Sequence, residues 1–273
     1  MALMHLAGRA VEYEVHGTGD PVVLCQPTWW PLDPWRLSGL PELSQAYRTV
    51  VFNQRGIGAS RGTDTDYSVE SMAKDTLALM DALGIERAHL VTFANGSMVA
   101  LRVAQLRPDR ARSLVLGAPG APVSRNPRAV SEAQRRHVME HGFETFIKGH
   151  AANDDFAFSP AGYKAHPERA AALADALWEH ARSPEEYLKH ALVRTDFDNL
   201  EQIDRVTHPV LVVTGSDDTV ARGDSNPVES SRLLASRMAN GRLELVPGLR
   251  HMLYWEAPEA CWPVVLEFLA RQS

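Results

Sequence analysis

The chain lacks the features that mark a membrane protein, a nucleic-acid-binding protein or a disulfide-stabilised secreted protein. Its 273 residues include only 2 cysteines and carry a net charge of −6, which argues against a general nucleic-acid surface. No apolar run reaches about 18 residues, the length of a membrane span, and the N-terminus has no basic stretch followed by an apolar one, so no signal peptide is expected. Cys25 and Cys261 lie in apolar runs, where buried thiols are expected. A reducing cytoplasm fits these absences.

A serine is missing from a position where the pattern of the chain leads us to expect one. Residues 88–91 read as a short buried strand and residues 97–104 as the start of a helix, with the turn T-F-A-N-G between them. This order is the setting of the G-x-S-x-G nucleophile elbow, which lifts one side chain out at the carboxyl edge of a parallel sheet. Ala94 holds that position, and Thr92 replaces the first glycine. The sequence therefore predicts the surroundings of a nucleophile without the nucleophile.

The residues that are present indicate an α/β fold. Hydrophobic residues make up 45% of the chain, and continuous apolar runs alternate with helical patterns, as in a mostly parallel sheet of about eight strands covered on both faces. A helix is expected over 68–83, because its apolar residues share one face and Gly84 follows as a stop signal. The apolar runs that we expect to form strands are 21–25, 49–52, 89–91, 113–116, 209–213 and 243–246.

The alternation of strands and helices breaks between residues 120 and 205. This stretch holds helical patterns, best defined over 129–148 and 168–180, and no clear strand. Ordinary crossover helices are one interpretation, but the stretch is too long for one crossover. We favour a helical lid at 120–205 inserted into a core domain made of 1–119 and 206–273.

Chemically useful side chains follow the last two expected strands. The sequence G-S-D-D ends at Asp218 just after one strand, and His251 lies in a glycine-bearing loop after the next. Functional groups gather at the carboxyl ends of parallel strands, and a carboxylate there can orient one imidazole nitrogen and leave the other to act as a base. Asp218 is the expected acid, with its neighbour Asp217 as the alternative, and His251 is the expected base.

Four segments resemble motifs of the α/β-hydrolase fold family, of the capped ester- and lactone-hydrolase type. N-Q-R-G-I-G-A-S at 53–60 resembles a D-x-R-G-x-G-x-S turn, and 215–218 resembles a G-x-x-D acid loop. The segment from His251 to Pro258 resembles G-H-x-x-x-x-E-x-P with Arg250 for the glycine, and C-Q-P-T at 25–28 stands where the family has its H-G-x oxyanion loop. The resemblance implies a triad of the residue at 94, Asp218 and His251, with no metal and no cofactor.

The resemblance also implies where a substrate would bind. Pro27 has no N–H to donate, so the N–H groups of Thr28 and Asn95 are the expected oxyanion donors. Trp29, Trp30 and Trp35 follow on the same loop, and Phe93 precedes Ala94. These aromatic side chains would form the wall for a hydrophobic or aromatic ester or lactone; the alternative is that they pack in the core.

Two interpretations of Ala94 stay open. In the favoured one, the chain is a serine hydrolase inactivated at Ala94, which binds its substrate without turning it over. In the other, the alanine is native, and the chain is a binding protein or an enzyme that uses His251 and Asp218 as a base without a covalent step, as lyase-like and cofactor-independent oxygenase members do. The expected partner is a small-molecule substrate, not nucleic acid or a membrane. Assembly into a homo-oligomer is left open.

Overall fold

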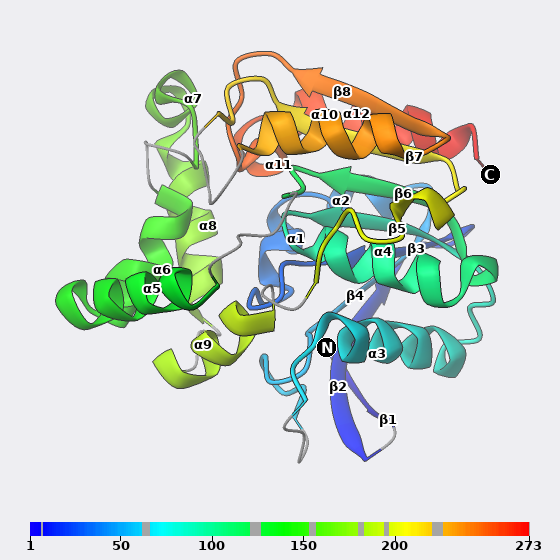
Figure 1. The fold of residues 1–273 in the computed structure, drawn as a ribbon, viewed down its shortest axis with the longest axis horizontal. Coiled ribbons are helices and arrows are strands. Elements are labelled where there is room, and N and C mark those ends of the chain that lie inside the picture. The colour runs from blue at the N-terminus through cyan, green and yellow to red at the C-terminus, as the bar shows by residue number, and fades with distance from the viewer. Residues whose placement is uncertain are drawn as a thin grey trace.

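The computed structural model describes residues 1–6, 8–61, 66–120, 127–152, 157–179, 183–193, 197–219 and 226–272. Within them the chain forms an 8-stranded sheet with the order β1-β2-β4-β3-β5-β6-β7-β8. The two pairings of β2 are antiparallel, and the other pairings are parallel (Figure 1). The strands are β1 Ala2–Leu6, β2 Arg9–His16, β3 Pro21–Cys25, β4 Arg48–Phe52, β5 Ala88–Phe93, β6 Ala111–Gly117, β7 Val210–Gly215 and β8 Gly241–Val246.

The fold class expected from the apolar runs is confirmed, and each expected strand is present. Every residue of β5 and of β7 is buried, as expected for strands covered on both faces. Strands β1 and β2 were not expected from the sequence, because they lie at the antiparallel edge and alternate exposed or half-buried residues with few buried ones. Such half-exposed strands carry no continuous apolar run.

Helices cover both faces of the sheet, because successive side chains of a strand point to opposite sides. Val22 and Leu24 of β3 pack in one core cluster and Val23 and Cys25 in the other. Residues of α1, α2 and α12 belong to the first cluster, and those of α3, α4 and α10 to the second. These helices are α1 Asp33–Leu37, α2 Leu40–Leu43, α3 Val69–Ala82, α4 Gly96–Leu106, α10 Pro227–Arg237 and α12 Pro258–Ala270, with α11 Leu253–Glu256 and the 3-10 turns η1 Pro108–Arg110 and η2 Ile203–Arg205 between them.

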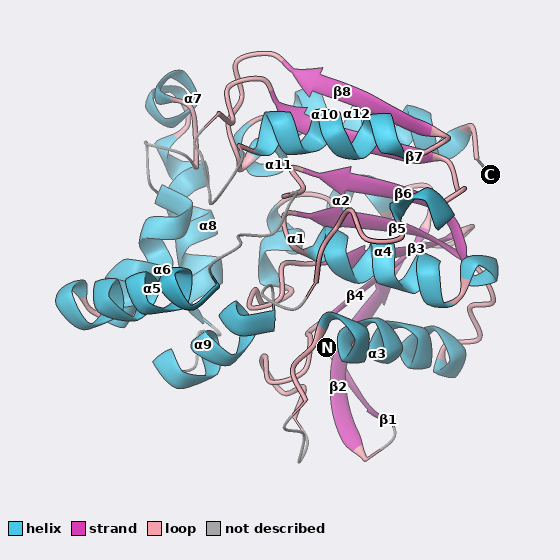
Figure 2. Cartoon of the chain, viewed as in Figure 1, coloured by secondary structure: helices cyan, strands magenta, loops and turns pink. Residues whose placement is uncertain are grey.

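A helical region is inserted between β6 and β7. Figure 2 shows its helices grouped beyond the arrowheads of the parallel strands, at the carboxyl edge of the sheet. Helix α8 packs against α1 and α11, so the insertion contacts the core next to that edge. None of the described helices is long and apolar enough to cross a membrane. The inserted helices are α5 Pro127–His141, α6 Phe143–Ala152, α7 Pro160–Ala165, α8 Pro167–Glu179 and α9 Pro184–Val193.

The prediction of a single helix over 129–148 is wrong in its extent. The segment 129–148 forms parts of two helices, α5 and α6, instead of one. Gly142 separates them with φ +85°, a left-handed conformation that glycine adopts without strain and that ends an α-helix. The helix expected over 68–83 is observed as α3, and the Ser68 side chain caps it by accepting from the N–H of Ser71.

The backbone around Gly96 leaves no room for a side chain, so we expect stability to depend on glycine at this position. A Cβ at Gly96 would overlap the carbonyl oxygen of Cys25 and lie 2.7 Å from that of Gln26. We expect Gly96→Ala to lower the free energy of unfolding by about 2–4 kcal/mol, measured by urea denaturation. The matched control is Gly149→Ala in α6, where a Cβ meets nothing within 4 Å, and where a gain of up to about 1 kcal/mol is expected. Equal urea midpoints for Gly96→Ala and the parent chain would contradict the close approach.

Candidate functional site

The turn between β5 and α4 has the backbone of a nucleophile elbow. Ala94 has φ +47° and is one of three non-glycine residues with positive φ in the described part of the chain. The N–H of Ala94 donates to the carbonyl of Gly117 on β6 at 2.7 Å, and the carbonyl of Ala94 accepts from the N–H of Ser97 at 3.2 Å. A left-handed alanine costs roughly 1–2 kcal/mol, and such strain gathers at functional sites. Ala94 therefore has a strained left-handed conformation in the turn where the sequence predicts a nucleophile elbow.

Thr92, which replaces a glycine of the elbow motif, is accommodated by hydrogen bonds. Its side chain is fully buried, and its Oγ1 lies 2.8 Å from the Oγ of Ser97 and donates to the carbonyl of Val115 at 3.0 Å. The hydroxyl of Ser97 is thereby paired inside the core. Thr92 therefore links β5 to β6 and to the first turn of α4.

The structure brings Asp218 and His251 together. The Nδ1 of His251 lies 2.7 Å from the Oδ2 of Asp218, and the two residues are 5% and 1% exposed. Asp217 is exposed, and it accepts a hydrogen bond from Ser216 at 2.7 Å. A Cβ at Gly215 would lie 2.6 Å from the carbonyl of Arg250, so a glycine there lets the two loops approach. Asp218, and not its neighbour, is therefore the residue that can orient the imidazole.

The loop from Gln26 to Leu32 joins β3 to α1 and lies against the elbow. The N–H of Thr28 donates to the Oδ1 of Asn95 at 3.1 Å, and the Nδ2 of Asn95 donates to the Oγ1 of Thr28 at 3.2 Å. Thr28 and Asn95 are thus neighbours, as expected. The contact is made by the side chain of Asn95, however, and it takes up the main-chain N–H that was expected to be a donor to substrate.

Asn53 holds this loop from the opposite side. Its Oδ1 accepts from the N–H of Leu32 and its Nδ2 donates to Glu12, both at 2.7 Å. Glu12 also accepts from the N–H of Ala59 at 2.8 Å. The N-Q-R-G-I-G-A-S turn is therefore a buried hydrogen-bonded support for the β3–α1 loop.

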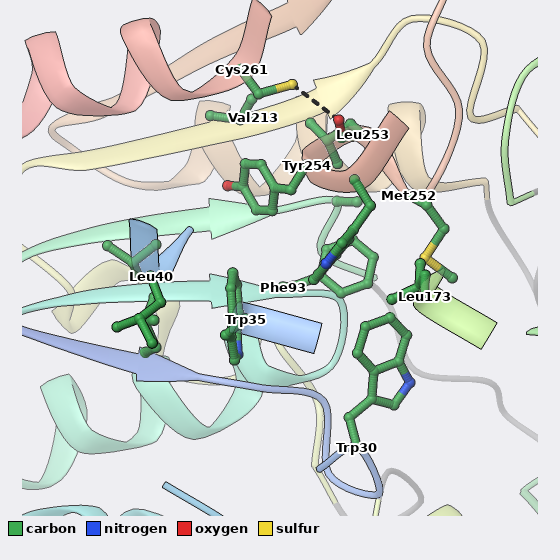
Figure 3. Packing of buried hydrophobic residues seen from close by; sticks show 14 of the residues in the cluster. Trp30, Trp35, Leu40, Phe93, Leu173, Val213, Met252, Leu253, Tyr254 and Cys261 are labelled. Carbon is green, nitrogen blue, oxygen red and sulfur yellow. Dashed lines mark hydrogen bonds between the residues drawn. The ribbon is translucent and has the colours of Figure 1, made fainter. Parts of the chain in front are cut away.

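Trp30 lies next to Phe93, the residue that precedes Ala94 (Figure 3). Trp30 is 3% exposed, and its ring lies 5.3 Å from those of Phe93 and Trp255. Trp29 is half-buried and meets Tyr187 of α9 edge to face at 5.1 Å. The ring of Phe93 lies 5.1 Å from that of His251. An aromatic cluster therefore extends from His251 through Phe93 and Trp30 to the half-buried Trp29.

Trp35 does not share this position. It is fully buried, and its ring contacts Trp255 at 5.4 Å, Tyr254 at 6.2 Å and Trp262 of α12 at 6.4 Å. Figure 3 shows Trp35 deeper in the core than Trp30. Trp35 therefore packs in the core against aromatic side chains of α11 and α12, as in the core-packing alternative.

Sequence reasoning missed two buried polar residues, His190 on α9 and Gln54 in the turn after β4. Burial lowers the pKa of His190 on α9 to about 3, and its main-chain carbonyl accepts from the Oγ1 of Thr28 at 3.3 Å. Gln54 is fully buried in the turn after β4. No pattern in the sequence distinguished either residue. Among the described residues no group of 3 or more His, Cys, Asp or Glu side chains could hold a metal ion.

A strained elbow, a buried acid–histidine pair and an 8-stranded sheet agree with the comparison to known families. Residues 16–258 match the family described as the alpha/beta hydrolase fold. The chain belongs to the α/β-hydrolase fold family. The residues outside this match hold β1, nearly all of β2 and nearly all of α12.

Curated relatives within the α/β-hydrolase fold family span nearly the whole chain. The proposed carbamate hydrolase RutD of Stutzerimonas stutzeri is 29% identical over 268 residues, which cover 96% of this chain and 97% of the relative. A proposed non-heme chloroperoxidase of Synechocystis is 28% identical over 274 residues, with 95% and 94% coverage.

Solved α/β-hydrolase structures show the same fold. An esterase from Thermogutta terrifontis superposes with a TM-score of 0.86 at 22% identity and covers 100% of this chain and 99% of its own. The enol-lactonase of Burkholderia xenovorans has a TM-score of 0.84 at 21% identity, with 98% and 100% coverage.

The buried His190 predicts a loss of stability in acid. Because burial holds the pKa of His190 at about 3 in the folded chain, the unfolded chain binds more protons between about pH 6.5 and 3. Stability therefore falls as the pH is lowered through that window. We expect His190→Phe to reduce the drop in unfolding free energy between pH 7 and pH 5 by about 2 kcal/mol, measured by urea denaturation at both pH values.

The exposed His5 provides the control for this pH experiment. His5→Phe should leave the pH dependence of stability as it is in the parent chain. His89 is also buried and has its pKa lowered to about 4, but it is present in all three proteins and cancels in the comparison. An unchanged drop in the His190→Phe variant would show that His190 is protonated without cost in the folded chain.

Proposed function

We propose that this α/β-hydrolase-fold protein binds a hydrophobic or aromatic ester or lactone at the carboxyl edge of the sheet, where Ala94 prevents the covalent step of a serine hydrolase. The observation that carries the proposal is Ala94 in a left-handed elbow, φ +47°, in a site that keeps a buried Asp218–His251 contact of 2.7 Å. The printed descriptions of similar proteins, a carbamate hydrolase, an esterase and an enol-lactonase, agree with an acyl substrate.

The proposed roles follow from triad chemistry. Asp218 fixes the tautomer of His251, and His251 would take the proton from a hydroxyl at position 94 as that oxygen attacks the acyl carbon. The main-chain N–H groups of Thr28 and Asn95 would hold the oxyanion that forms. A methyl group has no lone pair to attack with, and losing a triad serine costs on the order of 10⁶ in kcat. Binding, which needs no oxygen at position 94, remains.

The contact between Asn95 and Thr28 sets a condition on binding. A substrate oxygen that accepts from the N–H of Thr28 must replace the Oδ1 of Asn95, which lies 3.1 Å from that nitrogen. The apolar part of the ligand would lie against Trp29 and Trp30, since Trp29 is half-buried next to α9. The inserted helices α5 to α9 would act as the lid over this site and set the shape of the substrate.

The retained Asp218–His251 pair also favours a second candidate, a serine-free reaction. A protein that only binds a ligand has no need of an oriented base, yet the pair is buried and hydrogen-bonded. In this candidate the Nε2 of His251, the ring nitrogen that does not face Asp218, acts as a general base on water or on a carbon acid. The two candidates differ in whether the chain turns over a substrate without a hydroxyl at position 94.

Restoring the hydroxyl should restore covalent chemistry. We expect Ala94→Ser to hydrolyse p-nitrophenyl butyrate with a burst of p-nitrophenol and a butyryl adduct visible by mass spectrometry, both absent from the parent chain. In that background His251→Ala and Asp218→Ala should abolish the burst, and Asp217→Ala, which changes an exposed side chain, should leave it intact. Turnover of the ester by the parent chain at the rate of Ala94→Ser, without an adduct in either, would favour the serine-free candidate.

The aromatic wall should contribute to the affinity for an apolar ligand. We expect calorimetry with phenyl acetate to show binding to the parent chain that is about tenfold weaker in Trp29→Ala, because the half-buried indole loses ligand contact worth about 1.4 kcal/mol. Met139→Ala on α5, at a side chain 77% exposed, is the control with unchanged affinity. Equal affinities for Trp29→Ala, Trp30→Leu and the parent chain would show that neither indole contacts the ligand.

A further inference from the structure

The carboxylate of Glu256 is buried where the inserted helices meet the loop that bears His251. Glu256 is the last residue of α11 and is 3% exposed. Its Oε1 accepts from the N–H of Ser159 at 3.1 Å and from the hydroxyl of the same serine, and its Oε2 accepts from the N–H of Arg250 at 3.3 Å. One buried carboxylate therefore binds the insertion with one oxygen and the residue before His251 with the other.

On the side of the insertion, the contact is made at the start of α7. The hydroxyl of Ser159 caps this helix by accepting from the N–H of Gly162 at 3.0 Å, and it donates to Glu256. A Cβ at Gly162 would overlap the Oε1 of Glu256, so a glycine there lets the first turn of α7 reach the carboxylate. From α8, the guanidinium of Arg169 donates to the main-chain carbonyl of Glu256 at 2.7 Å. Two inserted helices are thus joined to one residue outside the insertion.

On the side of the histidine, both residues that flank His251 are held. The N–H of Arg250 donates to the side chain of Glu256. The N–H of Met252 donates to the carbonyl of Ala157 in the insertion, and its carbonyl accepts from the N–H of Glu256, both at 2.8 Å. The main chain around His251 is therefore bonded to Glu256 on each side of the histidine, and to the insertion directly.

The acid loop supports the same segment, 249–252, at its other end. The N–H of Asp217 donates to the carbonyl of Leu249 at 3.0 Å, and the Oδ2 of Asp218 lies 2.7 Å from the Nδ1 of His251. The segment is thus bonded to the acid loop where it begins and to the insertion where it ends. Functional side chains need such support, because small displacements of a reacting group cost much of its effect.

A carboxylate is the side chain that satisfies all the donors around Glu256 at once. The three groups that face it are two N–H groups and a hydroxyl, and a carboxylate accepts at both oxygens. A glutamine of the same shape has one acceptor and one NH₂ group, which would face the N–H of either Ser159 or Arg250. Hydrogen bonds to a buried carboxylate offset the cost of its burial and are short-ranged and directional, so they fix the positions of their donors.

We propose that Glu256 is a positioning residue for His251. It holds the imidazole against Asp218 by tying the histidine loop to the start of α7, and it makes α7 and α8 a fixed part of the site instead of a freely moving cover. The use of His251 as a base rests on the proposed function. The orientation of its ring by Glu256 does not, because it requires no group at position 94.

Proton NMR of the parent chain tests the orientation directly. The proton between His251 and Asp218 lies in a buried 2.7 Å contact and should give a resolved low-field signal, assigned by its loss in His251→Gln. We expect Glu256→Leu to abolish this signal and Glu256→Gln, which keeps one acceptor, to shift it upfield. The matched control is Glu259→Gln: the exposed Glu259 also accepts from Arg169 of α8, and its loss should leave the signal unchanged.

Kinetics in the Ala94→Ser background separate positioning from mere stabilisation. With p-nitrophenyl butyrate, well below the Tm of each variant, Glu256→Gln should slow the burst about ten- to a hundredfold. The ester concentration at half-saturation should stay the same, because binding of the ester does not need the imidazole. Glu259→Gln should change neither value. An unchanged burst rate in Glu256→Gln together with a lowered Tm would show a structural role only and would overturn the proposal.

A milder variant keeps the test decisive if Glu256→Leu fails to fold. Ser159→Ala removes one donor to the Oε1 of Glu256 and leaves the carboxylate in place, so it should shift the low-field signal in the same direction by a smaller amount. An unchanged signal in both Ser159→Ala and Glu256→Gln, or a parent chain without the signal, would overturn the proposal. An inactive Ala94→Ser variant, with the signal shifted as expected in Glu256→Gln, would reject the proposed function and keep the positioning role.

Discussion

The close approach of the Gly96 backbone to the carbonyl oxygens of Cys25 and Gln26 is the constraint on which the site depends. It brings the first turn of α4 against the end of β3, and with the hydrogen bond from Ala94 to Gly117 it leaves the elbow little freedom. The strain of a left-handed alanine persists because these neighbours over-determine the turn. Everything that faces Ala94 is placed relative to this one contact, including Asn95, the β3–α1 loop and, through Phe93, the ring of His251.

The aromatic side chains extend this rigidity from the elbow into the core. The ring centroids of Trp30, Phe93 and Trp255 lie 4.9–5.3 Å from one another, as in favourable aromatic contacts. The ring of Trp255 also contacts that of Trp35 at 5.4 Å. The Nε1 of Trp255 donates to the carbonyl of Pro34 at 2.8 Å, and so ties α11 to α1. The loop that bears His251 leads directly into α11, so the packing of the indoles helps to hold the imidazole that Asp218 orients.

How much of this could be predicted from the sequence differs between the sheet and the insertion. The parallel strands could be predicted because burial on both faces leaves continuous apolar runs, and the positions of Ala94, Asp218 and His251 follow from where such strands end. The edge strand β1 and its neighbour β2 could not, because half-exposed strands have no such run. The contact of Asn95 with Thr28 joins residues 67 apart through a side chain, and α9 reaches the loop by tertiary packing alone, so neither leaves a local pattern. Trp35 and Trp30 look alike in sequence, and only the packing of α12 distinguishes them.

The Oδ1 of Asn95 would compete with a ligand oxygen for the N–H of Thr28, to which it is already hydrogen-bonded. The amide oxygen of Asn95 is tethered next to the N–H of Thr28, so it is present at a fixed local concentration however dilute the ligand is. In the proposed oxyanion pocket a ligand oxygen would bind only to the fraction of molecules in which that amide has turned away, and the apparent dissociation constant would rise by the inverse of this fraction. Weak acceptors would lose this competition, while an oxygen that gains negative charge would win it. A single side chain can in this way make the proposed oxyanion pocket more discriminating than its two N–H groups alone would be.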